Sequence, residues 1–296
     1  MALTLLCDTT AVLRLDDYLD RVEAEVDLRD PDSIAASAPW LRELANDRSL
    51  VVNRLNRYVE ESFSGRDYGS AQAILLGRRK DFYVRANLWP STRDVATARI
   101  YQDQFSYNLA HDHNFNFLTV SYLGPGYETD IYEYDPETVV GYVGEPVEIR
   151  FLERVKFQQG MVMMYRASRD LHVQYPPVDL TVSLNLLIAP PETCLREQYH
   201  FDLERKVIAA LPPELEASER VSFVRMAGQI GDANSQQLLA DLAARHPCRR
   251  TRIAASEALA RLRPQEAQAI WERAAADLSP LVQREARQVL AALAAA

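Results

Sequence analysis

The chain has 296 residues, of which 48% are hydrophobic, enough for one large domain or for a main domain with an appendage. Its net charge is -9, and residues 1–203 carry 20 basic against 31 acidic side chains, a balance that repels a polyphosphate backbone. No apolar run is long enough to cross a membrane, and the first residues lack the pattern of a signal peptide. We therefore expect a soluble protein without nucleic-acid or membrane partners.

The three cysteines are Cys7, Cys194 and Cys248, and they lie far apart in the chain. Their odd number and wide spacing argue against a disulfide framework and against a thiolate metal site. This usage is typical of a reducing compartment, so the expected location is the cytoplasm.

Residues 12–63 show helical periodicity, with apolar side chains recurring from Leu13 to Val22 and again from Leu50 to Val59. The segment Asp30–Ser33 can cap a helix between them. We assign residues 1–69 to a helical cover that packs on one face of the following domain.

From residue 70 to residue 191 the pattern becomes strand-like, with short apolar runs such as 73–76, 82–89 and 98–101 bounded by polar, Gly or Pro residues. Many short strands predict a sandwich or a barrel. The Gly124-Pro125-Gly126 turn predicts a hairpin that folds the run 110–123 back on residues 127–135.

Residues 192–296 return to helical periodicity, and they contain an internal repeat. Residues 251–262 align with residues 282–293, and a looser copy lies at 222–230. Two-helix units of this length resemble HEAT-like α-solenoid repeats, which suit binding of a protein partner or self-association. The basic cluster Arg245–Arg252 is predicted to be a solvated helix end.

Only five histidines occur in the chain, and three fall in the β region: His111, His113 and His172. If residues 110–123 form one strand, His111 and His113 share a face with Phe115, Phe117, Thr119 and Ser121. Three imidazoles that leave other coordination positions open suit Fe(II), and less specifically Mn, Ni, Cu or Zn. The alternative is that the pair is structural. Phe115, Phe117, Phe105 and Tyr107 could line a substrate site, although ordinary core is the simpler interpretation.

Four motifs carry a resemblance over residues 100–188: His-x-His before a strand, Thr-x-x-Tyr-Leu, Gly-Pro-Gly, and a Gly-bounded strand leading to His-x-x-x-Pro. Together they resemble the double-stranded β-helix superfamily of cupins and 2-oxoglutarate-dependent Fe(II) oxygenases. The resemblance implies an α+β protein with a jelly-roll core at residues 70–191. It also implies catalytic metal ligation by His111, His113 and His172.

The sequence departs from that family in two respects. A histidine stands where a carboxylate ligand is usual, and hairpin pairing would bring Glu133 or Asp135, rather than Glu128 or Asp130, to the histidine face. The family's Arg-x-Ser motif, whose arginine holds 2-oxoglutarate, is Thr181-Val182-Ser183 here. Thr181 and Ser183 are therefore candidate co-substrate residues. Either another cation replaces the arginine, with Arg166, Arg169, Arg85 and Lys156 as candidates, or 2-oxoglutarate is not used.

The sequence thus predicts a non-haem Fe(II) dioxygenase or hydroxylase acting on a small-molecule or peptide substrate with O2, with 2-oxoglutarate left open. One alternative is a metal-binding cupin that performs no oxidation, such as an isomerase or a ligand-binding module. Another is a scaffold in which the helical repeats do the binding.

Overall fold

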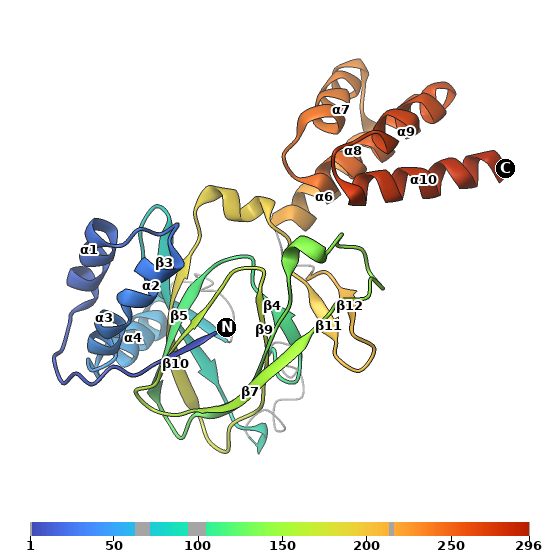
Figure 1. Ribbon diagram of the computed structural model, residues 1–296. Coiled ribbons are helices and arrows are strands. Elements are labelled where there is room, and N and C mark those ends of the chain that lie inside the picture. The colour runs from blue at the N-terminus through green and yellow to red at the C-terminus, as the bar shows by residue number, and fades with distance from the viewer. Residues whose placement is uncertain (1, 63–71, 94–104, 213–215, 296) are drawn as a thin grey trace. The chain divides into compact units, whose positions relative to one another are not determined.

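The computed structural model describes residues 2–62, 72–93, 105–212 and 216–295, and the chain forms two compact units (Figure 1). The first unit comprises Met1–Pro136, Val147–Thr193 and His200–Lys206. The second comprises Glu137–Pro146, Cys194–Tyr199 and Val207–Ala296. The predicted boundary between residues 69 and 70 and the predicted strand 98–101 lie outside the described residues. The three-part division at 69/70 and 191/192 stays a prediction.

Two antiparallel sheets form the first unit. The first sheet has the order β1-β8-β5-β10-β3-β2, formed by β1 (Leu3–Leu5), β8 (Val162–Tyr165), β5 (Phe117–Leu123), β10 (Thr181–Ile188), β3 (Phe82–Trp89) and β2 (Ala73–Arg78). In the second sheet the strands of this unit follow the order β11-β4-β9-β6-β7, formed by β11 (His200–Asp202), β4 (Ala110–Asp112), β9 (Asp170–Gln174), β6 (Tyr127–Glu133) and β7 (Arg150–Phe157). An α+β protein is confirmed, while the finer jelly-roll assignment stays a prediction.

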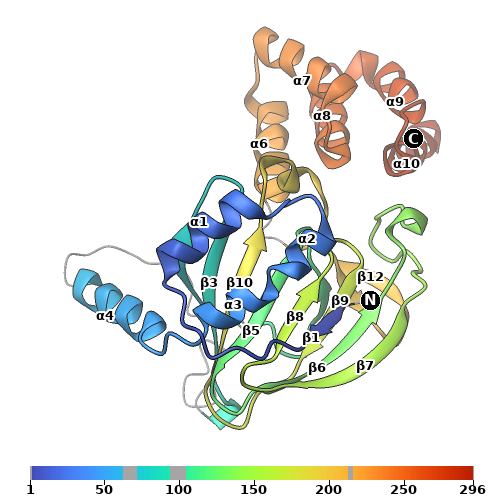
Figure 2. The same cartoon turned by 60° about the vertical axis from the view of Figure 1, so that its left-hand side comes forward.

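Four helices cover the outer face of the first sheet, as Figure 2 shows. They are α1 (Leu15–Glu25), α2 (Pro31–Ala36), α3 (Ala38–Leu44) and α4 (Leu50–Ser62). The Asp30 carboxylate accepts a hydrogen bond from the Asp32 backbone N–H and caps α2, as its sequence predicts. Fully buried Tyr18, Ile34 and Leu41 pack with Val84, Val120 and Leu184 of the sheet. Helices between residues 15 and 62 thus cover one face of the first sheet, while the assignment of residues 1–69 to a helical domain stays a prediction.

A second apolar cluster lies between the two sheets. It combines Phe117, Tyr165 and Leu187 from the first sheet with Ile131 and Phe157 from the second. Because strand side chains alternate between faces, β3, β5 and β10 send one set toward the helices and the other set toward the second sheet. These strands are consequently buried on both faces, and β10 has no exposed residue.

Two predictions about the run 110–135 are wrong. The run 110–123 is not one strand: it breaks at residues 113–116, so that β4 belongs to the second sheet and β5 to the first. The Gly124-Pro125-Gly126 turn does not close a hairpin either, because β6 pairs with β7 and β9 rather than with β5. Gly124 and Gly126 have positive φ and approach the backbones of Leu180 and Phe157 closely, which no side chain would permit.

The second unit is mainly helical. Its helices are α6 (Glu216–Ile230), α7 (Ala233–Arg245), α8 (Arg249–Leu262), α9 (Ala267–Ala275) and α10 (Pro280–Ala295), and strand β12 (Val207–Ala210) belongs to it as well. Short 3-10 helices occur at η2 (Pro136–Thr138), η3 (Pro191–Leu195) and η4 (Pro264–Glu266). Helix α8 buries Ala254, Ala255 and Ala258, and a side chain at Gly228 of α6 would collide with Ala258. Small residues therefore allow close helix packing, while the HEAT-like character stays a prediction.

The basic cluster of this unit is not a solvated helix end. Arg249 and Arg250 form ion pairs with the buried carboxylate of Glu197, and Arg252 pairs with Asp277. These arginines neutralise acids inside the unit. None of the helices in the described part of the chain combines the length and apolar character that a membrane crossing requires.

The helical cover yields a stability prediction. Replacement of fully buried Leu41 by Ala leaves an unfilled space, so the free energy of unfolding should fall by about 2–5 kcal/mol in urea titrations. The control is Leu55→Ala in α4, where the leucine is 42% exposed and the loss should stay below about 1 kcal/mol. Equal losses at the two positions would contradict the packing described.

Candidate metal centre

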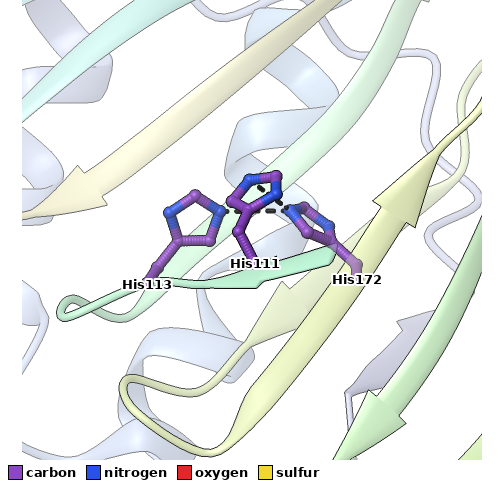
Figure 3. A group of neighbouring side chains, drawn as sticks. All are labelled: His111, His113 and His172. Carbon is purple, nitrogen blue, oxygen red and sulfur yellow. Dashed lines mark hydrogen bonds between the residues drawn. The ribbon is translucent and has the colours of Figure 1, made fainter. Parts of the chain in front are cut away.

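Three histidines converge between the two sheets (Figure 3). His111 lies on β4 and is the cross-strand partner of His172 on β9, so both side chains leave the second sheet on one face. His113 follows β4 in the segment that crosses to the first sheet, and its carbonyl accepts a hydrogen bond from the Ser168 N–H at 2.6 Å. That bond ties the crossing segment to the loop before β9 and places the third imidazole beside the other two.

The three rings present their Nε2 atoms to one another. The Nε2 of His172 lies 3.1 Å from that of His113 and 3.2 Å from that of His111. Two nitrogens bound to one metal at about 2.1 Å and at roughly 90° to 110° stand about 3.0–3.4 Å apart. The residues present therefore fit a metal ion held on one side by three imidazoles, with further coordination positions left to other ligands.

Burial keeps these imidazoles neutral. It lowers the pKa of His111 to about 4, with smaller contributions from His200 and Arg85. It also lowers the pKa of His113 and of His172 well below the ordinary value, and the neighbouring histidines add to the effect. Because a metal binds the neutral ring, the site needs no deprotonation at neutral pH.

Polar groups lie beside the Nδ1 atoms of two of the candidate ligands, His111 and His172. The Nδ1–H of His111 donates to the Leu109 carbonyl at 2.9 Å, which leaves the lone pair on Nε2. The side-chain Nε2 of Gln174 lies 3.4 Å from Nδ1 of His172, and Gln174 Oε1 has no hydrogen-bond partner in the part of the chain that the structure describes. Turned by 180°, the same amide presents Oε1 to an Nδ1–H and leaves the lone pair on His172 Nε2. Polar partners of this kind fix the orientation of metal-binding histidines in proteins.

Aromatic side chains lie against half-buried His113 and buried His172. The centroid of His113 lies 4.8 Å from that of Phe117 and 5.0 Å from that of Phe115, and the His172 centroid lies 4.8 Å from that of Tyr165. Phe117 and Tyr165 stack on each other at 4.6 Å. Phe105 and Tyr107 instead form a separate stacked pair, with Tyr107 beside Trp89. The first group covers His172 and part of His113.

No carboxylate joins the three histidines among the described residues. Glu133 forms ion pairs with Arg150 and Arg166, and Asp130 pairs with Arg154. The hairpin register that would have brought Glu133 or Asp135 to the histidine face does not exist, because β5 and β6 lie in different sheets.

The three candidate co-substrate residues, Thr181, Ser183 and Arg166, form hydrogen bonds or ion pairs with different partners. Ser183 is buried and accepts a hydrogen bond from Trp89 Nε1 at 3.1 Å, and the Thr181 hydroxyl donates to the Asp179 carbonyl at 3.3 Å. Arg166 is paired with Asp170 and Glu133. A role of these residues in binding a co-substrate stays a prediction.

His200 and Gln174 are neighbours of the site that the sequence did not indicate. His200 belongs to β11 opposite His111, with ring centroids 6.4 Å apart, rather than to a helical region. Gln174 lies two residues after His172 on the same face of β9. That spacing is the signal that could have identified Gln174, whereas the placement of His200 depends on strand pairing.

Comparison with known proteins assigns no family: no family model matches the chain, and no curated protein matches it. Among solved structures, a hydroquinone 1,2-dioxygenase from Sphingomonas sp. TTNP3 aligns at 7% identity over 42% of this chain and 69% of that chain, with a TM-score of 0.27. A cupin domain from Bordetella pertussis aligns at 12% identity over 42% of this chain and 98% of that chain, with a TM-score of 0.22. A DMSP lyase structure aligns at 12% identity over 36% of this chain and 38% of that chain, with a TM-score of 0.20. Likenesses at this level assign no function to this chain.

The buried histidines predict acid sensitivity of the metal-free protein. An unfolded histidine takes up a proton near its ordinary pKa of 6.5, whereas folded His111 does so only near pH 4. The unfolded chain therefore binds more protons in this window, and stability falls as the pH falls from about 6.5 to about 4. His111 alone contributes about 3 kcal/mol to that loss.

Urea titrations of the metal-free protein across this pH range provide the measurement, with His111→Gln as the comparison. The variant should lose less stability on acidification than the wild-type protein, because its side chain takes up no proton. Identical pH profiles for the two proteins would contradict the prediction.

Gln174 should support metal affinity without binding the metal itself. Gln174→Leu removes the polar partner of His172 Nδ1, so the dissociation constant for Zn²⁺ or Co²⁺ should rise about 10- to 100-fold. Titration against a competing chelator measures this constant. Gln158→Leu, at an exposed position, is the matched control and should leave the affinity unchanged.

Proposed function

We propose that this protein is a metal-dependent enzyme of the cupin type, and specifically a non-haem Fe(II) oxygenase that modifies a small-molecule or peptide substrate with O2. The observation that carries the proposal is the convergence of three neutral imidazoles at 3.1–3.2 Å between the sheets. Imidazole donors with open positions suit Fe(II). A bound Fe(II) would supply redox chemistry with O2 at those positions.

The protein's own residues supply three conditions for such chemistry. His111, His113 and His172 bind the metal as neutral ligands, because burial suppresses their protonation. The ring partners Leu109 and Gln174 hold two of the imidazoles in place. Phe117 and Tyr165 exclude water, which protects reactive species from side reactions.

A non-oxidative metal-binding cupin, such as an isomerase or a ligand-binding module, is the second candidate. The observation that favours it is the absence of a carboxylate from the group among the described residues. Three neutral histidines with an open fourth position also form a common catalytic zinc site. The identity of the metal separates the two candidates.

The use of 2-oxoglutarate stays open, since Thr181 occupies the position of the expected arginine. Association with a protein partner, or self-association, through helices α6–α10 likewise stays a prediction.

Metal analysis of the purified protein, followed by anaerobic Fe(II) titration, tests the proposal. Wild-type protein should bind one Fe(II) per chain, and nitric oxide, used in place of O2, should give the paramagnetic resonance signal of an iron nitrosyl. His172→Ala should lose both properties, whereas His246→Ala, in the second unit, should retain them. A charge-transfer absorption band on addition of 2-oxoglutarate would identify it as a co-substrate.

Failure of the wild-type protein to bind Fe(II) would remove the oxygenase proposal. Stoichiometric zinc in the purified protein, combined with failure of the iron-loaded protein to bind nitric oxide, would favour the non-oxidative candidate. Retention of Fe(II) binding by His172→Ala would contradict the assigned ligands.

A further inference from the structure

The inner face of the first sheet carries an unusual set of polar side chains. Asn185 on β10 is the cross-strand partner of Arg85 on β3 and of Thr119 on β5, so these three lie in one row. Ser183 is likewise the partner of Asn87 and Ser121, which gives a second row two residues along the strands. Residues of the same parity, such as Phe117 and Leu187, belong to the cluster between the sheets. Both rows therefore face the second sheet, as the histidines face the first.

Five atoms in these two rows are buried without a hydrogen-bond partner: Arg85 Nε, Thr119 Oγ1, Asn185 Nδ2, Asn87 Oδ1 and Ser121 Oγ. Buried polar atoms are almost always paired in folded proteins, and an unpaired one costs free energy. Their concentration on one face of one sheet indicates that a polar ligand, rather than protein, completes these hydrogen bonds.

Arg85 adds a positive charge to these two rows of side chains. No acidic residue on the neighbouring strands of the sheet balances that charge. Strands β3, β5, β8 and β10 contain no Asp or Glu. Burial lowers the pKa of Arg85, yet a guanidinium remains a cation at neutral pH. Arg85 also lowers the pKa of His111 and His113, as expected of a cation that faces the same interior.

The other three cations suggested by the sequence are placed differently. Arg166 is neutralised by Asp170 and Glu133. Arg169 and Lys156 are exposed. Arg85 is thus the member of this group that lies on the inner face and has no carboxylate partner among the described residues.

We propose that Arg85, together with Asn185 and Thr119, binds the carboxylate of a small organic acid between the two sheets. The guanidinium and the Asn185 amide donate hydrogen bonds to the carboxylate, which supplies the charge that the sheet lacks. The proposal deepens the proposed function and rests on it for its chemistry, because it specifies which class of molecule is presented to the metal.

Spacing along β5 limits the size of the acid. Thr119 lies two residues from Phe117, whose ring contacts His113. Two residues of a strand span about 7 Å, so an acid of only a few carbon atoms reaches from the Arg85 row to the histidine row. The carboxylate belongs either to the substrate itself or to a 2-oxo acid used as co-substrate.

Calorimetric titration of the metal-free, full-length protein with succinate, benzoate and 2-oxoglutarate tests the proposal. At least one acid should bind, and its neutral amide, succinamide or benzamide, should bind much more weakly. Arg85→Met should weaken binding of the acid about 10- to 100-fold, as expected for the loss of a charge-assisted hydrogen bond. Arg169→Met, the matched control at an exposed arginine, should bind as the wild-type protein does.

A stability measurement keeps the test informative. Because Arg85 has no carboxylate partner in the part of the chain that the structure describes, Arg85→Met should leave the urea midpoint of the ligand-free protein unchanged or higher, whereas loss of a structural arginine would lower it. If Arg85→Met does not fold, Arg85→Lys and Asn185→Leu replace it. Arg85→Lys should retain part of the affinity for the acid, and Asn185→Leu should bind the acid several-fold more weakly than the wild-type protein does.

The outcomes separate this inference from the proposed function, because binding is measured without metal or O2. Loss of acid binding in Arg85→Met, with binding intact in Arg169→Met, supports the inference whether or not the protein binds Fe(II). No binding of any acid to the wild-type protein, or equal binding to Arg85→Met, would overturn it. A gain in affinity for 2-oxoglutarate, but not for succinate, on adding Mn²⁺ would identify the acid as a 2-oxo co-substrate. If Mn²⁺ affects the affinities for 2-oxoglutarate and succinate equally, the bound acid is identified as the substrate.

Discussion

The removal of three imidazoles from water is the constraint on which the first unit depends. A histidine in water is partly protonated near neutral pH, and a protonated ring does not bind a metal. Here burial between two sheets lowers the pKa of His111 to about 4 and lowers those of its neighbours as well. The stacked rings of Phe117 and Tyr165 lie against His113 and His172 and contribute to that burial. The fold therefore sets the protonation state of the three candidate ligands as well as their positions.

The two faces of the first sheet differ in composition. The face toward the helices is apolar and carries residues such as Val84, Val120 and Leu184, which stabilise the fold by burial. The face toward the histidines carries the unpaired polar atoms of the Arg85 and Asn87 rows, which cost stability in the absence of a ligand. Proteins keep such unfavourable groups mainly where function requires them. The polar rows and the histidines thus form one interior whose composition suits ligand binding.

The errors of sequence interpretation have a common physical cause. Gly-Pro-Gly is compatible with a tight hairpin and equally with a turn that carries the chain from one sheet to the other, since both need positive φ. The His-x-His run likewise reads as one strand, although its backbone hydrogen bonds go to β9 and β11 before residue 113 and to β8 and β10 after residue 116. Local residues do not specify which distant strand supplies the partner. For the same reason, the strand that carries His200 was not recognised within the predicted helical region 192–296.

Periodicity and side-chain chemistry by themselves determined the helical cover, the α+β class, the cap at Asp30 and the three candidate ligands, because these follow from short-range spacing and residue type. Tertiary structure decided that no carboxylate joins the histidines among the described residues, that Arg166 is neutralised, and that Arg85 faces the interior. The placement of Arg85 depends on a cross-strand neighbour 100 residues away in the chain, Asn185. Only the folded pairing of strands brings such residues together.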